Sequence, residues 1–97
     1  GWYKRGLTLF ALERKEEAIL SCNKAIEIKP DYWNSWYFSG LIQYELAQYD
    51  KAITSFDTVI RIKPDYHDAW VSRGNTLYQL QQYKEAVLCY DKAIQLK

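Results

Sequence analysis

The segment Ile28-Lys29-Pro30-Asp31-Tyr32 returns unchanged, 34 residues later, as Ile62-Lys63-Pro64-Asp65-Tyr66. Residues 2–35 and 36–69, aligned without gaps, are identical at 14 of 34 positions. The same step separates three sets of residues along the 97-residue chain: Trp2, Trp36 and Trp70; Gly6, Gly40 and Gly74; Ala18, Ala52 and Ala86. A fixed period of this length is the signature of a repeat architecture. The sequence therefore predicts a single array of three tandem units, at approximately 1–32, 33–66 and 67–97.

Each unit has the pattern of two helices. In the first half, Trp2, Gly6 and Leu9 fall at i, i+4 and i+7, which places them on one helical face. Pro30 and Pro64 end the second helices, because proline lacks an amide donor and restricts the residue before it. Asp31 and Asp65 follow, and we expect them to cap the next helices. The predicted helices span residues 1–13, 16–29, 33–47, 50–63, 67–81 and 84–97.

The repeated small residues predict close packing between helices. Glycine inside a helix costs roughly 1 kcal/mol relative to alanine. The return of glycine at Gly6, Gly40 and Gly74 therefore indicates that the two helices of each unit must approach closely. The expected small partners on the second helices are the repeated alanines. A single helix pair cannot bury its apolar faces alone, so neighbouring pairs must stack. The expected fold class is all-α.

Composition excludes several classes of protein. The formal net charge is +1, whereas a protein dedicated to nucleic acid needs a clear basic excess. No apolar run approaches the roughly 18 residues of a membrane span. There is no basic-then-apolar leader, so we expect no membrane partner and a cytoplasmic location. A single histidine, His67, and two distant cysteines, Cys22 and Cys89, predict free thiols, no metal, no cofactor and no enzymatic activity.

These residues resemble the tetratricopeptide repeat (TPR), whose 34-residue unit carries a Trp, Gly, Tyr, Ala, Phe and Pro pattern. The second unit matches at Trp36, Gly40, Tyr44, Ala52, Phe56 and Pro64. The third matches at Trp70, Gly74, Tyr78, Ala86, Tyr90 and Ala93, and the first at Trp2, Gly6, Phe10, Ala18, Ala25 and Pro30. The resemblance implies an α-α superhelix, a right-handed solenoid of three antiparallel helix pairs with a concave groove. One departure is that Arg5, Ser39 and Arg73 precede the glycines, where the family usually has leucine.

The resemblance also places the first helix of each unit along the groove. The candidate binding residues are then mostly aromatic or aliphatic: Tyr3, Leu7 and Phe10; Tyr37, Leu41 and Tyr44; Val71, Asn75 and Tyr78. The alternative is that these side chains simply pack between adjacent helices. Chaperone-binding members carry a clamp of Lys, Arg and Asn for a peptide's terminal carboxylate, but the clamp phases here hold residues such as Tyr3, Leu41 and Asp68. We therefore predict no binding of acidic chaperone tails.

The leading functional hypothesis is a non-catalytic scaffold that binds a protein, as a peptide or helix, in an apolar, tyrosine-rich groove. The alternatives are a self-assembling repeat segment and a regulatory appendage of a larger enzyme. A nucleic-acid-binding helical repeat is disfavoured by the apolar groove and the near-zero charge. The chain begins inside a first helix and stops just before the equivalent of Pro64, so we expect a fragment of a longer array whose ends associate end to end.

Overall fold

The computed structural model describes residues 2, 4, 5 and 14–97. Within this described part of the chain, five helices follow one another and no strand is formed. Each helix packs against the next, and α3 also contacts α5. The helices are α2 (Lys15–Ile28), α3 (Trp33–Glu45), α4 (Tyr49–Ile62), α5 (His67–Gln79) and α6 (Tyr83–Leu96). This confirms the predicted all-α superhelix; the helix predicted at 1–13 lies largely outside the described residues.

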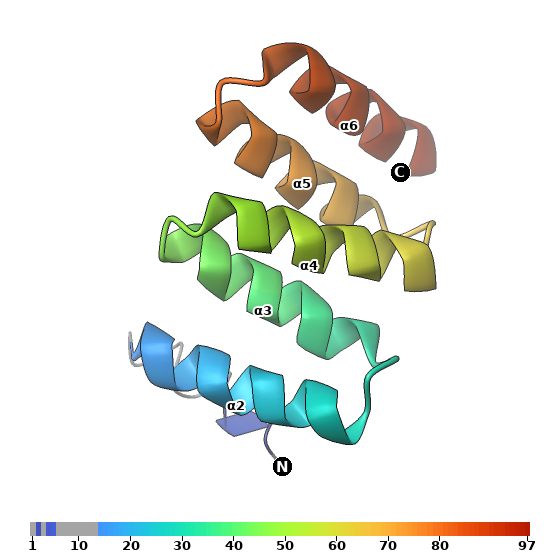
Figure 1. The fold of residues 1–97 in the computed structure, drawn as a ribbon. Coiled ribbons are helices and arrows are strands. Elements are labelled where there is room, and N and C mark those ends of the chain that lie inside the picture. The colour runs from blue at the N-terminus through green and yellow to red at the C-terminus, as the bar shows by residue number, and fades with distance from the viewer. Residues whose placement is uncertain (1, 3, 6–13) are drawn as a thin grey trace.

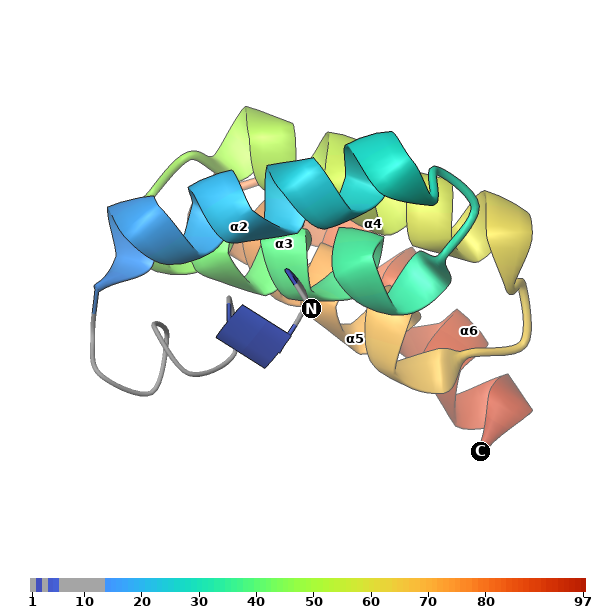
Figure 2. The same cartoon turned by 90° about the horizontal axis from the view of Figure 1, so that it is seen from below.

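The helices stack in a row and divide into two layers. Figure 1 shows the row running from α2 at one end to α6 at the other. Seen from below in Figure 2, α2 and α4 lie in one layer and α3 and α5 in the other. Apolar side chains between helices form the core, which includes Phe38 and Ile42 of α3, Phe56 and Val59 of α4, and Leu77 of α5. The layering leaves the α3 and α5 surface available to line a binding site.

The glycines in α3 and α5 allow an aromatic ring to lie against the helix backbone. A Cβ on Gly40 would lie 2.6 Å from Cε1 of Phe56, and a Cβ on Gly74 would lie 2.7 Å from Cε1 of Tyr90. The predicted close approach is therefore present. The expected partner was wrong, however, because the glycine meets a ring on the second helix. The repeated Ala18, Ala52 and Ala86 are also buried.

The repeated tryptophans of α3 and α5 connect each hairpin to the turn before it. Trp36 Nε1 donates to the Pro30 carbonyl oxygen at 2.6 Å, and Trp70 Nε1 donates to the Pro64 carbonyl oxygen at 3.1 Å. Proline ends the preceding helix, and the tryptophan then satisfies its exposed carbonyl group. The same contact therefore recurs at the 34-residue step of both residue types.

The first helices end two residues earlier than predicted. Ala47 and Gln81 adopt positive φ angles of 60° and 63°. Behind Ala47, the Gln48 amide donates to the Gln43 carbonyl at 2.8 Å, and the Ala47 amide donates to the Tyr44 carbonyl at 3.0 Å. This is a Schellman motif, which stops α3 at Glu45. Glycine usually occupies the left-handed position, so neither residue type signals the stop.

The predicted aspartate caps are wrong. Tyr32 and Tyr66 occupy the N-cap positions of α3 and α5, and neither helix has a side-chain cap hydrogen bond. A backbone turn brings the Tyr66 amide to the Lys63 carbonyl at 3.2 Å, so the helix cap falls one residue after Asp65. The Oδ1 atom of Asp65 instead lies 3.9 Å from Lys63 Nζ, as an ion pair.

No helix among the described residues is both long enough and apolar enough to cross a bilayer.

Candidate functional site

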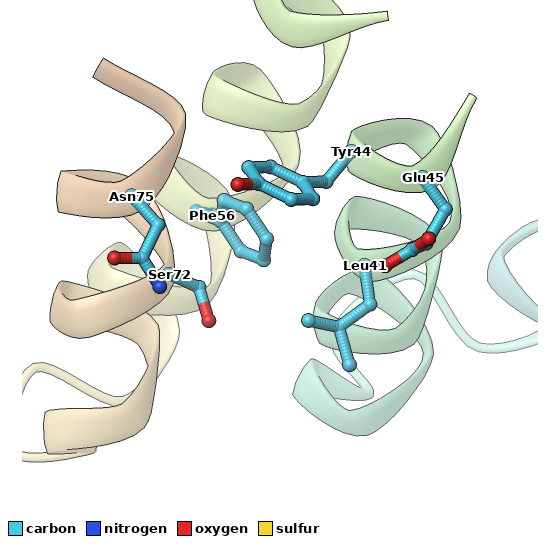
Figure 3. Close-up of a pocket in the computed structure, with 6 residues that line it drawn as sticks. All are labelled: Leu41, Tyr44, Glu45, Phe56, Ser72 and Asn75. Carbon is cyan, nitrogen blue, oxygen red and sulfur yellow. The ribbon is translucent and has the colours of Figure 1, made fainter. Parts of the chain in front are cut away.

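A pocket of about 270 Å³ opens between α3 and α5, and we call it the α3–α5 pocket. Three helices contribute its lining: Leu41, Tyr44 and Glu45 from α3, Phe56 from α4, and Ser72 and Asn75 from α5. Figure 3 shows the rings of Tyr44 and Phe56 in the middle of the pocket. Leu41 and Glu45 of α3 lie on one side of these rings, and Ser72 and Asn75 of α5 lie on the other. The pocket therefore has an aromatic centre and polar groups on its α5 side.

Helical spacing positions the lining residues. Leu41, Tyr44 and Glu45 fall at i, i+3 and i+4 on one face of α3, and Ser72 and Asn75 fall at i and i+3 on α5. Phe56 is fully buried against Gly40, which fixes the ring beneath the pocket. Packing between the helices therefore sets the walls of the pocket.

The two α5 residues of the pocket lining, Ser72 and Asn75, each have a tyrosine hydroxyl as a hydrogen-bond partner. Tyr90 donates its hydroxyl proton to Asn75 Oδ1 at 2.6 Å. The Ser72 hydroxyl lies 3.3 Å from the Tyr37 hydroxyl. Burial raises the pKa of Tyr37, and nearby Asp68 raises it further while the Ser72 hydrogen bond lowers it. Tyr37 is therefore a neutral phenol at physiological pH.

Among the described residues, Glu45 is the only charged one in the pocket lining, which holds no lysine or arginine. Its side chain is 49% exposed, and its carboxylate lies 4.0 Å from Lys15 Nζ of α2. An exposed pair at that distance is weak and leaves the carboxylate able to meet a ligand. The electrostatics of the pocket therefore favour a neutral or cationic ligand group.

Of the nine residues predicted for the groove, the pocket brings together Leu41, Tyr44 and Asn75. Tyr37 lies beside the pocket, but its ring contacts Tyr66 at 5.2 Å and Phe56 at 5.9 Å between centroids. It is half-buried. Much of this side chain therefore packs between adjacent hairpins.

The remaining predicted residues are dispersed. Val71 lines a separate hollow of about 350 Å³, next to Asp68 and Tyr90. Tyr78 is 56% exposed, and its ring meets that of Tyr83 at 5.2 Å. The first-unit candidates Tyr3, Leu7 and Phe10 lie outside the described residues.

Sequence reasoning missed three of the lining residues. Glu45 lies four residues after Leu41, and Ser72 lies three residues before Asn75, so helical spacing from the predicted residues would have found both. Phe56 carried no such signal, because it belongs to a second helix and was assigned only to the family pattern. Its ring reaches the pocket because Gly40 leaves space for it.

The cysteines and the histidine of the described residues are not part of the α3–α5 pocket lining. No group of three or more His, Cys, Asp and Glu side chains among them could hold a metal ion. Cys22 and Cys89 are buried free thiols, as predicted. Burial raises the pKa of Cys22 to about 11, which keeps it protonated and unreactive. His67 Nε2 lies 3.0 Å from Asp68 Oδ1.

Comparison with protein families identifies the repeat. A model described as tetratricopeptide repeat matches residues 1–32 and 67–97, and a second, described as TPR repeat, matches residues 40–81. The chain belongs to the tetratricopeptide repeat family. It is thus an array of the kind that serves as a protein-interaction scaffold, a fold that is generally non-catalytic. No curated protein sequence matches the chain.

Solved TPR structures superpose closely on the chain. A crystal structure of MamA has a TM-score of 0.96 at 29% identity, covering 98% of this chain and 56% of MamA. This chain thus spans little more than half of that protein. The first TPR of Spaghetti (RPAP3), bound to the HSP90 peptide SRMEEVD, has a TM-score of 0.96 at 20% identity, covering 99% of this chain and 76% of that one. The second TPR of Spaghetti, bound to the same peptide, has a TM-score of 0.95 at 19% identity, covering 99% and 89%.

Proposed function

We propose that the chain binds a peptide or helix of a partner protein across the α3–α5 surface, with one apolar side chain of the ligand in the α3–α5 pocket. The observation that carries this proposal is the open pocket itself, walled by Leu41 and Tyr44 and based on the Phe56 ring. Its volume of about 270 Å³ lies just below the range of small-molecule sites, roughly 300–1,000 Å³. It therefore suits a single anchoring side chain better than a cofactor.

The charge of the surface defines the ligand further. Glu45 lies in the pocket lining and Asp68 lies in the first turn of α5, where its side chain is half exposed. A carboxylate ligand would meet these acids with no cation in the described pocket lining. We therefore propose an apolar anchor residue flanked by lysine or arginine, which can pair with Glu45.

The acidic residues Glu45 and Asp68 disfavour the kind of acidic peptide that two relatives carry. The Spaghetti TPR domains carry the peptide SRMEEVD, whose end is acidic. The peptide bound to those relatives supports a peptide as the class of ligand for this chain. At 19–20% sequence identity, the likeness itself shows only a shared fold. We propose that the present chain does not bind an acidic chaperone tail, because such binding requires cations facing the groove.

The experiment is selection from a random peptide library, followed by titration of the selected peptides. We expect the selected sequences to share an apolar residue with a nearby basic residue. Tyr44→Ala and Leu41→Glu should each weaken binding at least about tenfold, the equivalent of roughly 1.4 kcal/mol. Glu45→Gln should weaken binding of the basic peptides selectively, with a smaller salt dependence.

The matched control is Leu20→Glu, which makes the same substitution at a 66% exposed leucine on α2. Binding by this variant should equal that of the unmodified chain. Equal binding by Tyr44→Ala and Leu41→Glu, with helical content unchanged by circular dichroism, would place the site elsewhere. Micromolar affinity for SRMEEVD would contradict the proposed charge preference.

A further inference from the structure

The α5 side of the α3–α5 pocket carries two polar groups, Ser72 and Asn75, which differ in what they offer a ligand. The Ser72 hydroxyl lies beside the Tyr37 hydroxyl, and either oxygen can be the donor, so Ser72 sets no preference between donors and acceptors. An asparagine amide, in contrast, has a separate acceptor, Oδ1, and a separate donor, Nδ2. The orientation of the Asn75 amide therefore decides which ligand group it can bind.

Tyr90 of α6 fixes that orientation. Its hydroxyl donates to Asn75 Oδ1 at 2.6 Å. Figure 3 shows Oδ1 on the side of Asn75 that faces away from the rings of Tyr44 and Phe56. Asn75 is exposed, so its amide would be free to turn without this bond. In the part of the chain that the structure describes, Nδ2 donates to no protein group, which leaves this donor for a ligand.

The position and the protonation of Tyr90 both suit this role. A Cβ on Gly74 would lie 2.7 Å from Cε1 of Tyr90, so the ring lies against the α5 backbone one residue before Asn75. Loss of solvation raises the pKa of Tyr90, and the nearby Tyr44 raises it further. Tyr90 is therefore a neutral phenol at physiological pH and always has a proton to donate.

The preceding repeat unit has an apolar pair at the same two positions. The residues 34 positions before Asn75 and Tyr90 are Leu41 and Phe56. Phe56 packs on its glycine without a hydroxyl group, so the hydroxyl of Tyr90 is not required for packing a hairpin. No other unit of the sequence has a tyrosine at this position. The phenol thus occurs in the one unit where its partner on the first helix is an amide.

We propose that Tyr90 is a positioning residue of the α3–α5 pocket, which holds Asn75 Nδ2 ready to donate to a carbonyl oxygen of the ligand. This inference rests on the proposed function and narrows its ligand. A helix uses its main-chain carbonyl groups for its own hydrogen bonds, whereas an extended peptide presents them to its surroundings. The ligand is therefore an extended peptide with a free carbonyl group near its apolar anchor, rather than a helix.

The first test is a double-mutant cycle, measured by titration of the peptides selected from the library. Tyr90→Phe should weaken binding about three- to tenfold, because the Asn75 amide is then free to turn. Phe56 shows that phenylalanine fits this position in a hairpin. In an Asn75→Ala chain, the same Tyr90→Phe substitution should weaken binding no further. An equal loss in both backgrounds would make Tyr90 a packing residue only and overturn the proposal.

The second test replaces each main-chain amide of a selected peptide, one at a time, by an ester, whose carbonyl oxygen is a weaker acceptor. One replacement should weaken binding to the unmodified chain and leave binding to Asn75→Ala unchanged. If every replacement affects both proteins equally, the ligand does not offer a main-chain carbonyl to Asn75, and the proposed extended ligand is wrong.

The matched control is Tyr83→Phe, the same substitution on the same helix at a residue outside the pocket lining. Its peptide binding should equal that of the unmodified chain. Nuclear magnetic resonance of the free protein tests the positioning without any ligand: the Asn75 side-chain amide should become more mobile in Tyr90→Phe and not in Tyr83→Phe. Equal mobility in Tyr90→Phe and the unmodified chain would overturn the proposal.

The two proposals fail in different ways. Peptide binding that is indifferent to Tyr44→Ala and Leu41→Glu would end the proposed function, while the mobility of the Asn75 amide would still report on Tyr90. Binding that depends on Tyr44 and Leu41 but shows no coupling between Tyr90 and Asn75 would end the present inference alone.

Discussion

Gly40 of α3 lies directly against the ring of Phe56 of α4, so closely that a Cβ at Gly40 would stand 2.6 Å from Cε1 and 2.9 Å from Cδ1. Phe56 is fully buried, and its ring lies between Gly40 and the α3–α5 pocket. The contact places the ring against the α3 backbone, where it lines the α3–α5 pocket.

Gly40→Ala should therefore destabilise the protein. Overpacking costs about 1–3 kcal/mol, which exceeds the roughly 1 kcal/mol that alanine gains in a helix. Gly74→Ala is the matched comparison, because its Cβ would meet Tyr90, which is only partly buried and can shift. Urea unfolding should show the larger loss for Gly40→Ala. Equal losses at the two positions would contradict the role of the buried Phe56 ring.

Glycine in place of the two residues that adopt a left-handed backbone conformation should stabilise the protein. Ala47 and Gln81 have φ angles of 60° and 63°, a conformation that costs a non-glycine residue roughly 1 kcal/mol or more. Ala47→Gly and Gln81→Gly should each raise the free energy of unfolding by about 0.5–1 kcal/mol, since glycine also loses more entropy on folding. Thermal unfolding measures the gain. As a control, Ala52→Gly, at a buried position within α4, should lower the free energy of unfolding. A lower free energy of unfolding in Ala47→Gly would contradict the idea that the backbone at Ala47 is strained.

We expect the loss of either tryptophan-to-proline hydrogen bond to lower the free energy of unfolding. Trp70→Phe keeps an aromatic ring but removes the donor to the Pro64 carbonyl. The carbonyl is exposed, so water replaces part of the lost bond, and we expect a loss of about 0.5–1.5 kcal/mol. Trp36→Phe should cost a similar amount through Pro30. Denaturant unfolding without change in either variant would show that these hydrogen bonds contribute nothing.

The buried thiol predicts a loss of stability in alkali. Burial raises the pKa of Cys22 from 9.0 to about 11, so the unfolded chain loses the thiol proton first. The resulting stability is fully present below pH 9 and is lost as the pH rises towards 11. Tyr37, whose pKa burial also raises, contributes in the same direction. Melting temperatures measured across this range should fall less steeply for Cys22→Ala. An identical slope in the variant would exclude the thiol as a source.

Repeat spacing predicted the helices well because it reflects local constraints. Pro30 and Pro64 stop the second helices whatever surrounds them, and the predicted bounds of the described helices agree with the structure to within two residues. The errors fall at Ala47 and Gln81, where packing imposes a backbone conformation that these residue types do not favour. The aspartate caps failed for a similar reason, since a backbone turn moves each cap by one residue.

The candidate site was only partly predictable. Leu41, Tyr44 and Asn75 were found because residues at groove phases share a helical face. The phase alone could not distinguish Tyr37, whose ring packs against Tyr66, from Tyr44, whose ring lines the pocket. That difference depends on neighbours from another repeat.

The amino-acid sequence by itself determined the period, the helix pairs, their order along the stack and the family, because each follows from residues that act within one repeat or on its neighbour. Only the tertiary structure decided where a cavity opens. Three helices must come together before the Phe56 ring, Leu41 and Asn75 can share one pocket.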